Sequence, residues 1–275
     1  WQIIPGGHFI ESGGSVSTHP DIYERVGMIA DHYHFDTSGK WQDSRDGKAN
    51  DFGGGHAHIG AMIYQADQWP EKYRNKLFTL NMHGRRANVE RLERSGSGYV
   101  GKHEPDVFFS DDLWFRGLEI TTGPDGSGYI LDWSDTGECH DLTGVHRTSG
   151  RIFKISYGKP QAPALEDLAT ITPDGAERLI RHSNVWYDRQ LRVRLMSNPP
   201  SKEVTERILK IATDPANTPV HRLRALWTLQ ATGSLPDSVS MKLLSENDEH
   251  LRTWGIRFLS DKLPLDTIHH GLAAK

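Results

Sequence analysis

Two pairs of histidines supply the side chain that most often ligates transition metals. Each pair has the spacing His-x-His, with His32 and His34 in one pair and His56 and His58 in the other. Because residues i and i+2 of a strand share one face, both imidazoles of a pair could reach a single ion. Imidazole ligands suit zinc, copper or iron. The alternative is that these histidines lie in buried turns and bond to carbonyl oxygens.

Two further groups in the first half could do chemistry. Residues 36–51 are rich in hard oxygen ligands, and calcium takes about six to eight of them. Their spacing differs from that of an EF-hand loop, and Arg45 and Lys48 would compete with the ion, so a solvated loop is the alternative. Cys139 precedes His140 and could act as a nucleophile or metal ligand, or be a buried, unreactive thiol.

Composition bounds the function classes. The chain has 275 residues, 25% of them charged, and a net charge of −4, so no strong field favours nucleic acid or anionic lipid. Its longest apolar runs are far shorter than the roughly 20 residues of a membrane span, and we expect none. A single cysteine excludes an intrachain disulfide, and without a Cys-x-x-Cys-His motif no c-type haem can attach covalently. The start at Trp1, without initiator methionine or signal peptide, leads us to expect a fragment of a longer protein.

The elements that must position these residues differ between the two halves. Residues 1–158 are rich in glycine, and short apolar runs between turn signals favour antiparallel strands. The predicted strands form a group of four and a group of three: 59–65, 76–82, 87–93 and 107–110, then 118–122, 128–133 and 151–157. Groups of about four short strands are the unit of a β-propeller blade, and about four to eight blades close a ring. We therefore predict an open set of C-terminal blades, completed by missing blades or a partner chain.

The second half predicts helices. Residues 159–164 are a proline-containing linker, and residues 165–275 carry apolar stripes at helical period. Leu191, Leu223 and Leu251 each precede an arginine on such a stripe, and we expect all three to point inward. Helix pairs that bury such stripes against their neighbours build α-solenoids such as HEAT repeats, with a generic helical bundle as the alternative. The predicted fold class is multidomain β plus α: partial β-propeller blades followed by an α-helical HEAT-like region.

An ordered set of motifs between residues 81 and 158 resembles one known family. The set comprises Asn81-Met82-His83-Gly84-Arg85-Arg86, Phe115-Arg116-Gly117, Gly123-Pro124-Asp125-Gly126, Asp132-Trp133 and the run from Gly150 to Gly158. It resembles the large membrane-bound dehydrogenases of planctomycetes and verrucomicrobia. In these, a propeller similar to that of soluble glucose and sorbosone dehydrogenases precedes HEAT-type helices and a haem c domain. The resemblance implies a periplasmic or extracytoplasmic location.

The same resemblance implies a cofactor site. In soluble quinoprotein sugar dehydrogenases, cationic side chains on the last blades hold the anionic cofactor pyrroloquinoline quinone (PQQ). The resemblance assigns this role to His83, Arg85, Arg86 and Arg116, although His83 stands where those enzymes have a lysine. The guanidinium fork suits carboxylates because it binds them bidentately. The alternative is that Arg85 and Arg116 are ion-pair partners that hold the strands together, with the following candidate carboxylates: Asp111, Asp112 and Asp132.

Three functional hypotheses follow. The first is a quinoprotein-like dehydrogenase module that oxidises a sugar or an alcohol and passes electrons to a haem c domain or cytochrome outside this chain; its catalytic base has no assigned position. The second is a non-catalytic interaction protein, favoured by His83 in place of lysine. The third is a metal-dependent hydrolase or lyase that uses the histidine-rich half.

Overall fold

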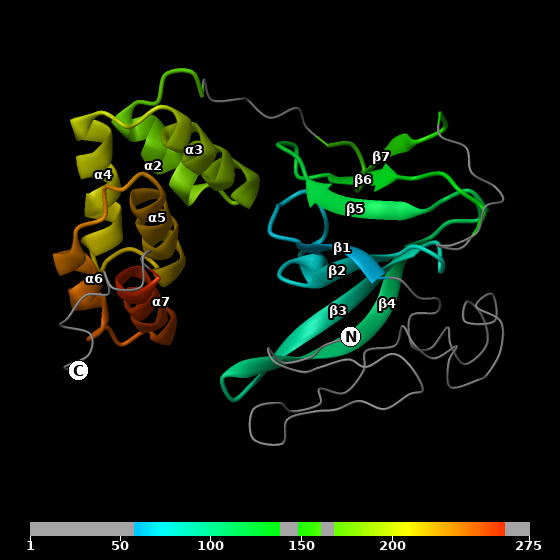
Figure 1. Ribbon diagram of the computed structural model, residues 1–275, viewed down its shortest axis with the longest axis horizontal. Helices are drawn as coiled ribbons and strands as arrows, with labels where there is room; N and C mark the ends of the chain where they lie inside the picture. The colour runs from blue at the N-terminus through cyan, green and yellow to red at the C-terminus, as the bar shows by residue number, and fades with distance from the viewer. Residues whose placement is uncertain (1–57, 138–147, 161–167, 262–275) are drawn as a thin grey trace. The chain divides into compact units, whose positions relative to one another are not determined.

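The computed structural model describes residues 58–137, 148–160 and 168–261 (Figure 1). The chain divides into two compact units. One unit holds the described strands and runs to Pro160, and the other holds the helices that follow. The division falls within residues 159–164, where the sequence predicts a linker.

The first sheet is a four-stranded antiparallel meander in the order β1-β2-β3-β4 (Figure 1). Its strands are β1 (His58–Ile63), β2 (Leu77–Asn81), β3 (Arg86–Ser95) and β4 (Gly98–Phe109), and a short 3-10 helix, η3 (Glu71–Tyr73), lies between β1 and β2. Only two residues connect β3 to β4. The first of them is a glycine with φ of 55°, as a type II′ turn requires, so a tight hairpin forms here.

The second sheet has three antiparallel strands in the order β5-β6-β7, namely β5 (Gly117–Thr122), β6 (Gly128–Asp132) and β7 (Arg151–Ile155). β5 packs against β1 and β2. This approach is close at Gly60, where a Cβ atom would lie 2.9 Å from the Cα atom of Glu119 and where φ is +63°. Both facts require glycine, which explains how β1 can cross so near to β5.

The predicted grouping into four and three strands is confirmed, with one correction. The ranges 87–93 and 107–110 are too short, because β3 and β4 continue to their shared turn. The added residues are largely exposed on both faces of the hairpin, so they lack the alternation that marks a half-buried strand. The two described sheets do not close into a ring. The mixed β plus α class is therefore confirmed, and the assignment of the sheets as propeller blades stays a prediction.

The described part of the second unit contains six helices. Their bounds are α2 (Pro173–Arg181), α3 (Val185–Ser197), α4 (Lys202–Thr213), α5 (Pro219–Ala231), α6 (Asp237–Leu243) and α7 (Glu249–Ser260). Thr172, Ser201 and Thr218 cap α2, α4 and α5 by accepting a backbone N–H at the helix start. Proline follows Thr172 and Thr218 directly, where its missing N–H costs nothing.

Consecutive helices pack against one another around one apolar core. α2 contacts α3, α4 contacts α5 and α6 contacts α7. Leu191, Leu223 and Leu251 are 0%, 8% and 1% exposed and belong to this core, so their predicted inward positions are confirmed. A HEAT-type repeat stays a prediction. None of the described helices combines the length and apolar character needed to cross a bilayer.

Candidate functional site

Residues 86–90 of β3 are buried on both faces, and the two faces differ in chemistry. Ala87 and Val89 pair with the apolar Leu80 and Phe78 of β2. The alternate residues of β3 carry polar side chains that are each no more than 3% exposed: Arg86, Asn88 and Glu90. Because a buried polar group without a partner is costly, this polar face must contain its own network of contacts.

That network begins at His58 on β1. Its Nε2 atom lies 2.6 Å from Oδ1 of Asn88, and Nδ2 of Asn88 donates to Oδ1 of Asp106 at 2.7 Å. Nη1 of Arg86 donates to the other oxygen of Asp106 at 3.0 Å. Asn81 adds a donor bond to Asn88 at 3.3 Å. The four strands are thus joined by side chains as well as by the backbone ladder.

A histidine–carboxylate pair lies at the other end of this face. Nδ1 of His103 is 2.8 Å from Oε1 of Glu90, and Nε2 of His103 is 3.8 Å from Oδ1 of Asp106. The bond to Glu90 raises the pKa of His103, helped by the charges of Glu90 and Asp106 and opposed by burial and by Arg86. Oε2 of Glu90 is buried and bonds to no described residue. The pair has the composition of an oriented acid–base catalyst, with a carboxylate fixing one imidazole nitrogen.

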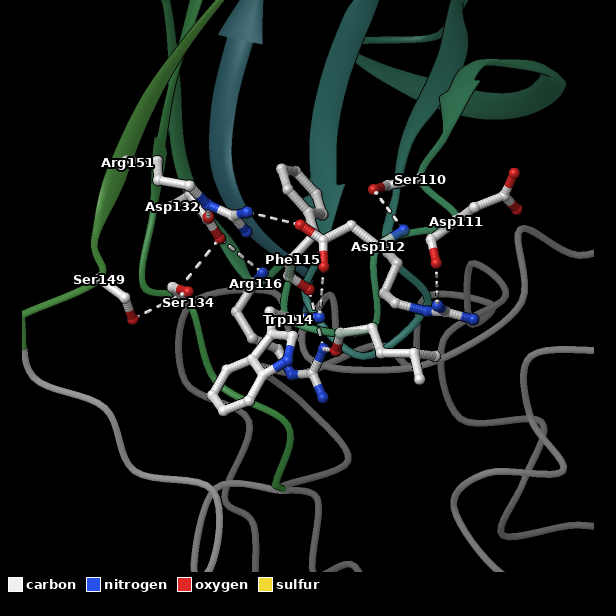
Figure 2. Close-up of polar contacts among 12 residues, drawn as sticks. Ser110, Asp111, Asp112, Trp114, Phe115, Arg116, Asp132, Ser134, Ser149 and Arg151 are labelled. Carbon is white, nitrogen blue, oxygen red and sulfur yellow. Dashed lines mark hydrogen bonds and ion pairs between the residues drawn. The ribbon is translucent and has the colours of Figure 1, made fainter.

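A second polar cluster surrounds Arg116, just before β5 (Figure 2). The backbone N–H of Arg116 donates to Oδ1 of Asp132 at 2.7 Å. Nε of Arg151 donates to Oδ2 of Asp132 at 2.6 Å, and Nη1 of Arg151 donates to Oδ2 of Asp112 at 2.5 Å. Asp112 also accepts the backbone N–H of Trp114 at 2.9 Å. That bond first, and then Arg151, lowers the pKa of Asp112 against the opposing effect of burial.

The guanidinium of Arg116 bonds to carbonyl oxygens. Nη1 donates to the carbonyls of Phe115 at 2.8 Å and Leu113 at 3.0 Å, and Nε and Nη2 each donate to the carbonyl of Gly137 at 3.4 Å. Arg116 is 2% exposed. Burial lowers the pKa of its side chain, with Asp135 opposing and the charge of Arg85 adding to the decrease. Arg116 therefore ties two loop segments together through their carbonyl oxygens, whereas the structural alternative given above used ion pairs with aspartates.

Arg85 is the predicted cofactor residue with the most unused donor capacity. Its guanidinium lies over the ring of Phe109 at 5.4 Å and makes one long bond of 3.4 Å to the carbonyl of Asp111. Nε of Arg85 is buried and has no hydrogen-bond partner among the described residues. The backbone of Arg85 has φ of 55°, a left-handed conformation that costs a residue with a long side chain about 1 kcal/mol or more.

The structure brings the four predicted cofactor residues into one hairpin and one loop. His83 and Arg85 lie in the turn between β2 and β3, and His83 is 1% exposed. Arg86 begins β3 and belongs to the polar face, while Arg116 belongs to the loop cluster. Arg85 lies near both, because its charge acts on Arg116 and its side chain shares the ring of Phe109 with Arg86.

Only one of the four predicted metal ligands, His58, lies in the part of the chain that the structure describes. His32, His34 and His56 lie outside the described residues, as do Cys139 and His140. His58 is described, and its Nε2 atom bonds to Asn88. Within residues 58–137, 148–160 and 168–261, no group of three or more His, Cys, Asp or Glu side chains could hold a metal ion.

Sequence reasoning missed Glu90, His103 and Asp106. A signal was present: polar residues at every second position of an otherwise apolar strand, from Arg86 to Glu90, mark a buried polar face. His103 and Asp106 on β4 carry no such signal. The register of β4 against β3 shifts between Ala87 and Val89, so simple alternation does not predict which β4 side chains face Arg86, Asn88 and Glu90.

Comparison with known proteins places the chain in a family. Residues 12–157 match the family described as a domain of unknown function, DUF7133. The chain belongs to the DUF7133 family. The matched region ends two residues after β7, so the β unit described here is the end of the DUF7133 domain and the helices lie beyond it. No curated protein and no solved structure matches the chain.

Proposed function

We propose that this DUF7133 protein is a section of a quinoprotein-like dehydrogenase that oxidises a sugar or an alcohol. The observation that carries the proposal is the pair formed by His103 and buried Glu90, 2.8 Å apart on the polar face of the first sheet. Oxidation of a hydroxyl needs a base that removes its proton. Glu90 fixes Nδ1 of His103 as the protonated nitrogen, which leaves Nε2 to accept the substrate proton. The bond to Glu90 raises the pKa of His103, and it also holds the imidazole in one orientation, as a general base requires.

The cofactor in this proposal is PQQ, which would accept the hydride when bound. Its carboxylates need cationic partners, and Arg85 fits that need because its Nε is buried with no described partner. Arg86 and Arg116 fit it less well: Arg86 already pairs with Asp106 at 3.0 Å, and Arg116 already bonds three carbonyls. We therefore assign the cofactor contact to Arg85, with Arg86 and Arg116 holding the strand and loop beside it.

The remaining parts of the proposal follow the family resemblance. The two open sheets are propeller blades that further blades or a partner chain complete, and the helix pairs are HEAT-like. Electrons leave to a haem c domain or cytochrome outside this chain, in a periplasmic or extracytoplasmic location. Two further candidate cofactors are calcium, through the oxygen-rich residues 36–51, and a transition metal, through His32, His34, His56 and His58.

The test separates cofactor binding from chemistry. PQQ is titrated into the chain while tryptophan fluorescence is followed, and dye-linked oxidation of sugars and alcohols is then measured with the complex. Arg85→Ala should weaken PQQ binding about tenfold or more, because a charged hydrogen bond contributes about 1.5–3 kcal/mol. His103→Gln should leave PQQ affinity unchanged and reduce kcat by roughly 10²–10⁴. The matched control is Lys102→Gln, an exposed neighbour of His103 on β4. Absence of PQQ binding both to the wild-type chain and to the chain together with the blades that complete it rejects the proposal.

A second candidate function is an interaction protein without a cofactor. The specific observation in its favour is Arg116. Its side chain is 2% exposed and donates to carbonyl oxygens of the loop instead of facing a ligand. If PQQ does not bind and Arg116→Ala lowers stability, this second function is preferred.

A further inference from the structure

The hairpin of β3 and β4 extends beyond the rest of its sheet (Figure 1). β2 covers β3 only as far as Glu90, which pairs with Leu77 at the start of β2. β3 continues to Ser95, paired only with β4 in this stretch. Residues 91–102 therefore form a two-stranded arm, closed by the Gly96-Ser97 turn.

The arm exposes apolar surface. Tyr99 is 55% exposed and Val100 is 43% exposed. Cross-strand contacts hold the ribbon together, with the guanidinium of Arg94 5.3 Å from the ring of Tyr99 and Nε of Arg91 donating to Glu104 at 3.1 Å. Two-stranded ribbons are marginal in water unless a further layer or strand packs on them. An additional strand would therefore stabilise the arm.

The backbone of the arm has an open edge at Leu92. In an antiparallel ladder, successive residues direct their N–H and C=O groups to opposite edges. Ser95 and Gly98 close the two-residue turn as a pair, and counting back from them places the polar backbone groups of Leu92 on the edge away from β4. No described residue pairs with Leu92 on that edge, because the first residue of β2, Leu77, lies opposite Glu90 and β2 does not extend as far as Leu92. Such an edge is a template for strand addition.

The charge of the arm indicates the partner. Residues 91–102 contain Arg91, Arg94 and Lys102 against Glu93, a net charge of +2. Arg91 pairs with Glu93 and with Glu104, so Arg94 and Lys102 carry the positive charge of the arm. The whole chain has −4, so the remainder carries −6. Lys102 is exposed and forms no ion pair with a described residue. A basic edge on an acidic chain attracts an acidic strand and disfavours a second copy of the same arm, because like charges would then meet.

We propose that the arm binds an extended, acidic segment of a partner protein, which adds as a strand along the open edge at Leu92. Backbone hydrogen bonds to Leu92 supply affinity. Carboxylates placed beside Arg94 on β3, with the exposed Lys102 on the neighbouring β4 adding to the positive field, supply selectivity. This inference does not depend on the dehydrogenase proposal.

The test uses the full chain and two synthetic probes, a labelled peptide of alternating glutamate and threonine and its lysine–threonine counterpart. Fluorescence anisotropy should show the glutamate peptide binding about tenfold or more tightly than the lysine peptide. Leu92→Pro should weaken that binding about tenfold, because proline removes the outward N–H while the pairing with β4 remains possible. Leu92→Ala retains the N–H and should stay within about threefold of wild type. Lys102→Glu should reduce the preference for the acidic peptide.

The proposal is overturned by several results. No binding of the glutamate peptide, equal binding of both peptides, or equal effects of the proline and alanine variants would each reject it. Sedimentation that shows a dimer dissociated by Leu92→Pro would instead assign the edge to a second copy. Circular dichroism of Leu92→Pro checks that the sheet persists, and if it does not, an N-methylated glutamate peptide replaces the variant and should bind about tenfold more weakly.

Discussion

Replacing Arg116 by alanine distinguishes a structural arginine from a cofactor ligand. The two short bonds to Phe115 and Leu113, at 2.8 and 3.0 Å, dominate the expected loss, and the two bonds of 3.4 Å to Gly137 add little. A bond from a charged donor contributes about 1.5–3 kcal/mol. Burial of the cation opposes this gain, as the lowered pKa of Arg116 indicates. We therefore expect Arg116→Ala to lower the free energy of unfolding by about 2–4 kcal/mol.

The assay must isolate the β unit, because the chain has two compact units. Hydrogen exchange measured by mass spectrometry on peptides from β5 and β6 does so, alongside thermal unfolding. For a unit of roughly 150 residues, this loss corresponds to a decrease in Tm of roughly 4–16 °C. Arg116→Lys keeps the charge, but one ammonium cannot replace the guanidinium fork at several carbonyls, so an intermediate loss is expected. Lys102→Ala, at an exposed position, is the control and should change stability by less than about 0.5 kcal/mol.

One pattern of results would refute this reasoning. If Arg116→Ala unfolds within about 0.5 kcal/mol of wild type while PQQ binding is lost, the carbonyl bonds contribute nothing to stability. Arg116 would then be a ligand for the anionic cofactor, as the family resemblance implies.

Three further predictions concern other parts of the chain. Leu223→Ala should destabilise the helical unit by about 2–5 kcal/mol, because Leu223 is 8% exposed in the core, whereas Val220→Ala, at a position that is 56% exposed, should have little effect in chemical denaturation. The raised pKa of His103 means that its pair with Glu90 stabilises the fold fully below the unfolded pKa of about 6.5 and loses this contribution as pH rises through the folded value; unfolding curves at several pH values should show this loss in wild type and not in His103→Gln. Arg85→Gly should keep stability within about 1 kcal/mol of wild type, because glycine tolerates the φ of 55° at no steric cost; a decrease of several kcal/mol in thermal unfolding would show that the side chain is structural.

The sequence predicted most strands because each has turn residues at its ends and apolar residues facing β-sheet neighbours. Ile120 and Ile130 are such residues, and both are buried in the second sheet. The arm of β3 and β4 was underestimated because its side chains face solvent on both sides, and exposed strands impose no apolar alternation. The helical unit was predictable from its stripes, and Leu191, Leu223 and Leu251 are all buried as expected.

The candidate site was less predictable because its roles depend on contacts between distant segments. Asp132 was a candidate partner for Arg116, but its carboxylate pairs with Arg151, 19 residues further along the chain, and reaches only the backbone N–H of Arg116. Carbonyl acceptors such as that of Leu113 have no sequence signature at all, since every residue carries one.

The left-handed backbone at Arg85 links the structural and functional interpretations. A turn that needs positive φ normally selects glycine or asparagine, and Gly84 stands directly before Arg85. The backbone of Arg85 is fixed from outside, because its carbonyl accepts the N–H of Ser110 at 2.8 Å. The strain is therefore maintained by the pairing of β3 with the end of β4, and its effect is to place a cation near Arg116 and the ring of Phe109. Asp112 supplies a counter-charge to Arg85, since the charge of Arg85 lowers the pKa of that carboxyl. The anionic cofactor that we propose would be a second one.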